Sequence, residues 1–177
     1  CGFQTAFIML HLPSYLVDAG MSANVGMTAV ALIGLFNIFG SFYFGWAGGR
    51  SSKKNLLVWI YGLRAVAIFI FMLVPLSTAA AWIFAAVIGI LWLGTVPLTN
   101  GLIAQIFGLR YMSMLTGVVF LGHQLGSFLG AWLGGRIFDE TGSYSLAWSI
   151  SIGLSILAAI CSWPVNEKPL ARLGTAT

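Results

Sequence analysis

Charged side chains are scarce in this sequence. Only 12 of its 177 residues are Asp, Glu, Lys or Arg, a share of 7%, where an ordinary soluble domain has about 25%. So few charges cannot cover the surface of a soluble protein of this size. A hydrophobic content of 59% and a mean hydropathy of +0.97 also exclude a disordered chain. The composition therefore indicates a membrane protein.

Cysteines, histidines and acidic clusters are scarce as well. The two cysteines, Cys1 and Cys161, are too few for a disulfide framework. The two histidines lie 112 positions apart, which is not the ligand spacing of a metal site. The eight Lys and Arg residues are too scattered for a phosphate-binding face. We therefore expect no metal, no other cofactor, no nucleic-acid partner and no enzymatic activity.

The few charges divide the sequence into long uncharged segments. Asp18 and Arg50 enclose 31 uncharged residues, and Arg64 and Arg110 enclose 45. One helix crosses the bilayer core with about 20 apolar residues, so the longer segment should contain two spans. No stretch alternates polar and apolar residues as the strands of a membrane barrel do. The sequence thus predicts an all-α, polytopic membrane protein with six transmembrane helices in a lipid bilayer.

The apolar segments and the cations set the expected boundaries and orientation. If the first span starts in the cytoplasm, six cations are cytoplasmic, and only Arg136 lies outside, in a solvated loop beside Asp139 and Glu140. The positive-inside rule favours this orientation, with a cytoplasmic C-terminus in a bacterial inner membrane. The six cytoplasmic cations are Arg50, Lys53, Lys54, Arg110, Lys168 and Arg172. The spans are expected at 1–17, 23–46, 55–74, 78–107, 112–134 and 145–163, with a polar tail at 164–177.

A sixteen-residue motif occurs twice in the sequence. Residues 35–50 (LFNIFGSFYFGWAGGR) and 121–136 (LGHQLGSFLGAWLGGR) are identical at eight positions, at an offset of 86 residues. That offset equals three spans, so the two copies must run in opposite directions across the membrane. An inverted repeat of three plus three helices is typical of secondary transporters. We therefore divide residues 1–163 into repeat one, about 1–75, and repeat two, about 78–163.

The loop after the second span carries the most specific motif. Its sequence GWAGGRSSKK is similar to the loop motif G-x-x-x-D-R-x-G-R-K of the major facilitator superfamily. Gly49 stands where the motif has Asp, and Ser52 where it has Gly, so the Asp-based latch of family members has no acid at that position. The matching positions are Gly45, Arg50, Lys53 and Lys54.

The resemblance covers the whole sequence and implies half of a major facilitator fold. It implies spans seven to twelve, with the missing N-terminal six-helix half of the same chain as a partner. Because the sequence starts in an apolar segment without the basic region or cleavage site of a signal peptide, we expect it to be part of a longer chain. Residues 11–20 (HLPSYLVDAG) resemble the seventh span of monocarboxylate-porter-like bacterial members, which implies an organic anion as solute and a coupling proton. In the family, the second and fifth helices line the central cavity.

Polar side chains in the middle of these two spans are candidate solute contacts. Asn37 and His123 occupy equivalent positions of the repeat, each about 20 Å along the helix from the repeat's arginine. Together with Gln124 they lie near the middle depth of the bilayer, where polar groups usually face the bundle interior or a water-filled cavity. His123 can also exchange a proton near neutral pH. The alternative is that these side chains only bond neighbouring helices together.

Other intramembrane residues allow the same two interpretations. His11 precedes Pro13, which should loosen the first helix, so His11 contacts either the solute or a neighbouring helix. Arg64 is the one cation inside a span, and it either binds a carboxylate or snorkels or bonds to other helices. In the fourth span, Asn100 lies in the segment GTVPLTNG, which predicts a hinge and a solute contact. The expected hinge residues are Pro13, Gly94, Pro97 and Gly101.

Small residues form a face on the fifth span. Gly122, Gly126, Gly130 and Gly134 recur at every fourth position, and such a face allows helices to approach closely. In the family such faces pack against the other half of the transporter, so we expect a helix-packing interface there. A similar face on the second span contains Asn37 and Gly45.

Taken together, the sequence predicts half of a secondary active transporter that works as a symporter or antiporter by alternating access. The expected solute is a small organic molecule, with a monocarboxylate or other organic anion favoured by the resemblance. Alternatives are a drug or metabolite exporter of the same superfamily, a non-transport membrane scaffold, and a complete six-span protein that acts as a homodimer.

Overall fold

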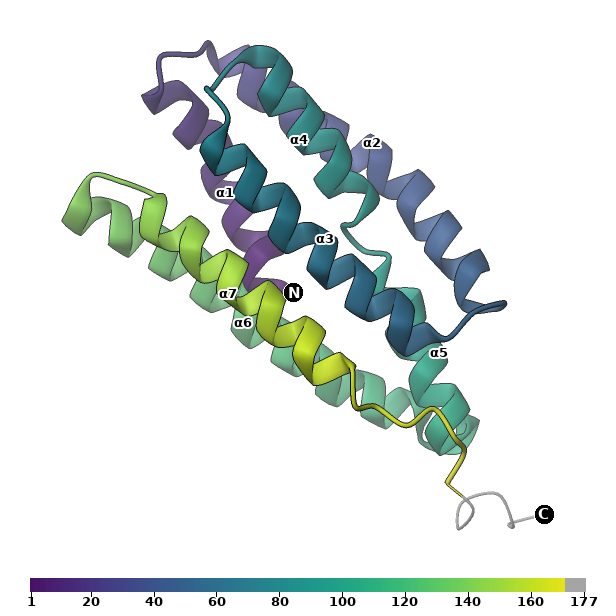
Figure 1. The fold of residues 1–177 in the computed structure, drawn as a ribbon. Helices are drawn as coiled ribbons and strands as arrows, with labels where there is room; N and C mark the ends of the chain where they lie inside the picture. The colour runs from purple at the N-terminus through teal and green to yellow at the C-terminus, as the bar shows by residue number, and fades with distance from the viewer. Residues whose placement is uncertain (171–177) are drawn as a thin grey trace.

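The computed structural model describes residues 1–170, and these residues form helices and loops without a strand (Figure 1). The end of the expected tail, including Arg172, lies outside the described residues. The helices are α1 (Gly2–Asp18), α2 (Ala23–Gly48), α3 (Lys53–Leu73), α4 (Thr78–Ile90), α5 (Thr95–Phe107), the 3-10 helix η1 (Leu109–Tyr111), α6 (Met112–Thr141) and α7 (Ser145–Ser162).

Five helical segments are long and apolar enough to cross a membrane. They are α2, α3, α4 with α5, η1 with α6, and α7. The helix α1 has 17 residues, or about 25 Å, slightly less than the bilayer core of about 30 Å. The long axes of the helices lie side by side in one bundle (Figure 1). The predicted all-α fold of a polytopic membrane protein is therefore confirmed, with α1 as its shortest span.

The end of α6 differs from the sequence-based expectation. The helix continues to Thr141 and contains Arg136, Asp139 and Glu140, which were expected in a solvated loop. Arg136 Nε donates to Glu140 Oε1 at 2.5 Å, a spacing of four residues that places both groups on one side of the helix. Gly142, with φ of +66°, then ends the helix in the left-handed conformation that favours glycine. The charged pair therefore extends α6 beyond its apolar part.

The helices pack in three long pairs. α2 lies along α4, α1 along α6, and α3 along α7. The six spans are α1, α2, α3, α4 with α5, α6 and α7. If spans one to three are exchanged for spans four to six, the α2–α4 pair becomes the α6–α1 pair, and the α3–α7 pair stays the same. A repeat of three plus three spans would have this pairing, and the division into two repeats stays a prediction.

Glycines of the repeated motif bring the paired helices close. A Cβ at Gly40 would overlap the carbonyl of Ile90 in α4, and a Cβ at the equivalent Gly126 would lie 3.2 Å from the backbone N of Phe3 in α1. Gly130 and Gly134 also contact α1, whereas Gly122 has open space beside it. The glycine face of the fifth span was expected to pack against the other half of the transporter. That expectation is wrong for Gly126, Gly130 and Gly134, because they pack against α1 inside the bundle.

The large apolar residues of the motif lie on the outer surface instead. Phe42 in α2 is 78% exposed and its equivalent Phe128 in α6 is 64% exposed. The pairs Leu35 and Leu121, and Trp46 and Trp132, are exposed in the same way. In the repeated motif Gly40, Gly126, Gly130 and Gly134 thus face neighbouring helices and these six large residues face outward, while Phe44 is buried; the outward side is open to lipid or to another part of a longer protein.

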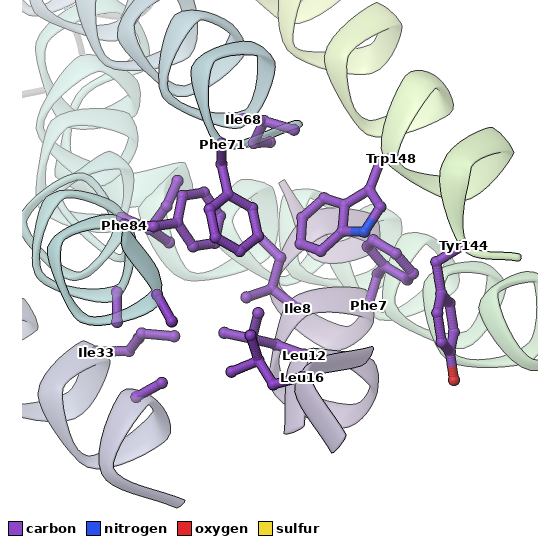
Figure 2. Close-up of a cluster of buried hydrophobic side chains, with 14 of the residues drawn as sticks. Phe7, Ile8, Leu12, Leu16, Ile33, Ile68, Phe71, Phe84, Tyr144 and Trp148 are labelled. Atoms are coloured by element: carbon purple, nitrogen blue, oxygen red, sulfur yellow. The ribbon is translucent and has the colours of Figure 1, made fainter. Parts of the chain in front are cut away.

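Aromatic rings fill one end of the bundle (Figure 2). Phe71 of α3 stacks on Phe84 of α4 with ring centroids 4.0 Å apart, and Trp148 of α7 meets Phe7 of α1 edge to face at 4.8 Å. Lipid tails are as apolar as these rings, so close packing rather than removal from water stabilises them. A second apolar cluster contains Ile60, and Arg64 lies between the two clusters along α3.

Candidate functional site

The fourth span is interrupted in the interior of the bundle. The helix α4 ends at Ile90 and α5 begins at Thr95, so residues 91–94 are not helical. A helix end leaves carbonyls unbonded, and a helix start leaves N–H groups unbonded. Inside a bilayer these groups must find partners in the protein. Two polar side chains from other helices supply these partners.

Arg64 of α3 bonds the carbonyls at the end of α4. Its Nε donates to the Leu91 oxygen at 2.9 Å, and its Nη2 donates to the oxygens of both Leu91 and Trp92. Its Nη1 donates to Gln4 Oε1 of α1 at 3.4 Å. The side chain is 2% exposed. This geometry favours the helix-bonding interpretation of Arg64 over a direct solute contact.

The positive charge of Arg64 has no carboxylate beside it. Within residues 1–170 the one ion pair is Arg136 with Glu140 at the end of α6. The C-terminal end of α4 instead presents the partial negative charge of its carbonyls to the guanidinium. The charge is therefore hydrogen-bonded but not neutralised, which leaves a positive potential inside the bundle.

Asn37 of α2 bonds the other side of the interruption. Its Oδ1 accepts from the backbone N–H of Leu93 at 3.1 Å and from Ser41 Oγ at 3.2 Å. Leu93 lies in the non-helical segment just before the N-cap Gly94 of α5, so Asn37 satisfies a backbone N–H group of the interruption itself. Asn37 and Arg64 therefore act from different helices on the same four-residue interruption.

Gln4 of α1 extends this polar group, and the sequence did not single it out. Its Nε2 donates to the Ser151 carbonyl at 2.8 Å and to Ser155 Oγ, both in α7, while its Oε1 accepts from Arg64. A glutamine in the first apolar span is the same signal that identified Asn37 and Gln124. It was missed because Gln4 lies outside the repeated motif.

Two of the four predicted hinge residues, Gly94 and Pro97, lie at the interruption, and Gly101 and Pro13 do not. Gly94 is the last non-helical residue, and a Cβ there would lie 2.5 Å from the ring of Phe44. Pro97 is in the first turn of α5, where a missing N–H removes no helical bond. Gly101 lies in the middle of α5 under the Lys53 side chain. Pro13 is different, because α1 continues through it as one helix and packs there against Gly26 of α2.

A cavity of about 640 Å³ lies beside the interruption, among α1, α3, α5, α6 and α7. The helix α6 contributes His123 and Thr116 to its wall, and α5 contributes Asn100, whose Oδ1 accepts from Thr116 Oγ1 at 3.1 Å. Most of the remaining wall is apolar. The polar residues that line it are Tyr61, Thr95, Thr99, Asn100, Thr116 and His123, together with Cys1 and Cys161.

The structure does not bring all predicted site residues together. His11 lies at the α1–α6 interface, where its Nε2 is 3.0 Å from the Ala131 oxygen and its ring packs beside Phe7 and Tyr144. Gln124 is exposed on the outer side of α6. Of the six proposed contacts, Asn100 and His123 line the cavity, and Asn37 and Arg64 bond the interruption.

The loop-motif residues lie around the C-terminal end of α2 and the start of α3. A Cβ added to Gly45 would lie 3.8 Å from the Cβ of Pro97 in α5. The Arg50 guanidinium lies over the Trp46 ring at 4.4 Å. Lys53 and Lys54 form the first turn of α3. Arg50, Lys53 and Lys54 therefore lie at helix ends away from the cavity wall, whereas Gly45 lies beside the first turn of α5.

These features define a class of protein. A bundle of membrane-spanning helices, an interrupted helix and a largely apolar cavity with a few polar groups in its wall are the architecture of a membrane transport protein. A cluster of three or more metal-ligating side chains is absent from the part of the chain that the structure describes.

Comparison with known proteins identifies the family. The family model described as Major Facilitator Superfamily matches residues 1–176. The chain belongs to this superfamily of transporters. It is 31% identical to an "Uncharacterized MFS-type transporter YcxA" of Bacillus subtilis over 179 residues, which cover 97% of this chain and 43% of the relative. It is 26% identical to human "Monocarboxylate transporter 12" over 145 residues, 80% of this chain and 28% of the relative. The chain therefore spans less than half the length of these relatives.

Proposed function

We propose that the chain forms the C-terminal half of a secondary active transporter that moves a small organic anion by alternating access. One observation carries the choice of an anion: the buried, unneutralised charge of Arg64 lies next to the cavity. Arg64 Nη1 donates to Cys1 Sγ, and Cys1 is part of the cavity wall. In a medium of low dielectric constant such a charge attracts anions over several ångströms. The names of the monocarboxylate transporter relatives support the same solute class.

The cavity residues supply the groups that would orient a carboxylate. Hydroxyl, amide and imidazole groups donate hydrogen bonds, and charge-assisted bonds to a carboxylate are about twice as strong as neutral ones. Asn100, Thr116 and His123 present such groups around an apolar pocket, the usual composition of a small-molecule site. His123 is in our proposal also the group that exchanges the coupled proton, because an imidazole titrates near neutral pH. A preceding six-helix half would complete the pathway, and in this proposal it contacts Gln124, which is exposed on α6.

Replacing His123 by Ala in the full-length transporter should reduce uptake of small carboxylates several-fold, because the solute loses a hydrogen-bonding group and the proton carrier. The variant His123→Gln keeps a donor but does not titrate, so its uptake should vary less between pH 5 and 8 than that of the unchanged protein. Radiolabelled uptake into cells or vesicles measures both effects. Ser149→Ala is the matched control, since Ser149 bonds only within α7 at the surface.

Two results would contradict this assignment. An unchanged pH profile in His123→Gln removes the residue from proton coupling.

Labelling tests the cavity itself: a cysteine at Thr116, in a cysteine-free background, should react with a water-soluble thiol reagent and be protected by solute. Complete lack of reaction would mean that residues preceding Cys1 in the full chain fill the cavity. Efflux of hydrophobic drugs, with no carboxylate uptake, would instead favour the exporter.

Orientation is part of the proposal and has a separate test. With the C-terminus in the cytoplasm of a bacterial cell, the loop between α2 and α3 is cytoplasmic and the loop between α6 and α7 is periplasmic. A membrane-impermeant thiol reagent added to intact cells should therefore label Ser143→Cys but not Ser52→Cys, each in a cysteine-free background. The reverse pattern would overturn the orientation and place the tail outside.

A further inference from the structure

The chain that follows α7 does not extend away from the bundle. Residues 163–170 run across the start of α3 and the end of α5 (Figure 1). Lys54 Nζ donates to the Trp163 oxygen at 3.3 Å, and Val165 packs against the apolar cluster that contains Leu57 and Leu102. This segment is called the strap below.

Glu167 of the strap binds the start of α3. Its Oε1 accepts from the backbone N–H of Lys54 at 2.9 Å, while Ser52, the N-cap residue, accepts from the N–H of Asn55. These two acceptors satisfy two of the four N–H groups that the start of a helix leaves free. A carboxylate is also favoured there by the partial positive charge of the helix start.

The same strap binds the end of α5. Gln105 Nε2 donates to the Glu167 carbonyl at 3.0 Å, and the Leu170 N–H donates to the Ile106 carbonyl at 2.9 Å. Lys53 Nζ of α3 donates to Gln105 Oε1 at 2.7 Å. The strap, the first turn of α3 and the last turn of α5 thus form one continuous hydrogen-bonded group.

This group lies at the loop motif that lacks its acid. Gly49 stands where the motif has Asp, and Glu167 brings a carboxylate to the Lys53 and Lys54 end of the same loop. We propose that residues 163–170 are a clamp that fastens α5 to α3 through the Glu167 carboxylate, so that these helices move together during transport. The clamp has a conformational role. Only the transport experiment that tests it rests on the proposed function.

The charge state of Glu167 suits this role. Burial acts to raise the pKa of Glu167, but the Lys54 N–H, the Ser52 hydroxyl, and the N–H and charge of Lys53 together hold the pKa below its ordinary value of 4.5. The contribution of the carboxylate to stability is therefore complete above about pH 4.5 and is lost as the pH falls through the lower pKa of the folded protein. The clamp is fastened throughout the neutral range.

Hydrogen exchange of the full-length transporter tests the clamp directly. In Glu167→Ala, the amides at the start of α3 and at residues 106–108 and 170 should exchange about tenfold faster, as expected for the loss of a bond to a charged group. Glu167→Gln keeps an acceptor without the charge and should give an intermediate effect. Asn166→Ala is the control, because Asn166 accepts only from the N–H of Lys168 within the strap.

The transport readout distinguishes a clamp from a solute contact. Glu167→Ala should lower the maximum rate of uptake and leave the half-saturating solute concentration unchanged, because Glu167 is not part of the cavity wall. Unchanged exchange in Glu167→Ala, or exchange accelerated equally in all helices, would overturn the clamp. Local acceleration with an unchanged maximum rate would overturn its role in movement. If the unchanged protein transports no solute, the proposed function fails, whereas the exchange result still decides whether the clamp exists.

Discussion

Replacing Arg64 by Met should lower the stability of the transporter by about 3 kcal/mol or more. Each hydrogen bond from a charged group contributes about 1.5–3 kcal/mol, and a buried carbonyl left without a donor costs about 1–3 kcal/mol. Arg64 donates to two such carbonyls at the end of α4, inside the bilayer. At about 2–4 °C per kcal/mol for 150–250 residues, the fall in the unfolding midpoint is roughly 6–12 °C for a unit of this length, and it is smaller if the whole longer transporter unfolds as one unit. Thermal unfolding in detergent, followed by size-exclusion chromatography, measures the change.

Two further variants make the result specific. Arg64→Lys keeps the charge but has one nitrogen in place of the guanidinium fork, so it should recover only part of the stability. Arg50→Met is the matched control, because Arg50 is exposed and packs only on the Trp46 ring. Equal midpoints for Arg64→Met and Arg50→Met would contradict the structural role of Arg64. A stable Arg64→Met protein that has lost affinity for carboxylates would return Arg64 to the solute site.

Replacing Gly40 by Ala should be as damaging, for a steric reason. The added Cβ overlaps the backbone carbonyl of Ile90, the last residue of α4, and a backbone atom cannot move aside as a flexible side chain can. Overpacking typically costs about 1–3 kcal/mol, and here it also separates α2 from the interruption that Asn37 bonds. We expect a lower unfolding midpoint and a lower yield of folded protein.

The same helix provides the control. Gly34→Ala places a Cβ in open space and replaces glycine by a better helix former, so its midpoint should be unchanged or slightly higher. On α6, Gly130→Ala should resemble Gly40→Ala, because its Cβ overlaps the Phe3 carbonyl, and Gly122→Ala should be neutral. If Gly40→Ala and Gly34→Ala unfold at the same temperature, the close approach of α2 and α4 is wrong.

The spans were predictable because the twelve charged residues separate long uncharged segments. The length of each uncharged segment limits how many membrane-spanning helices it contains. The interruption was also predictable from Gly94 and Pro97, although it lies slightly earlier, at residues 91–94. What the sequence did not contain was the direction of each side chain. Arg64 looked the same whether it faced a solute or the end of α4, and only the position of α4 decides between them.

The glycine face illustrates the same limit. Spacing of four residues shows that a face exists, but not which helix approaches it, and α1 takes that place for Gly126, Gly130 and Gly134. The Asp139 and Glu140 segment was misjudged for a different reason. The span was expected to end at residue 134 with these charges in a solvated loop, whereas the Arg136–Glu140 pair stabilises another turn of α6. A charged side chain is unfavourable at the centre of a bilayer, whereas Arg136 and Glu140 are both exposed at the end of α6.

The fixed guanidinium in the bundle has a consequence for ions. The two carbonyl oxygens of Leu91 and Trp92 are oriented as a cation would require, but Arg64 already occupies them with a permanent positive charge. Sodium or potassium approaching this depth would be repelled by that charge and would find these oxygens engaged. An alkali-metal gradient could therefore drive this protein only through a binding site elsewhere in the molecule.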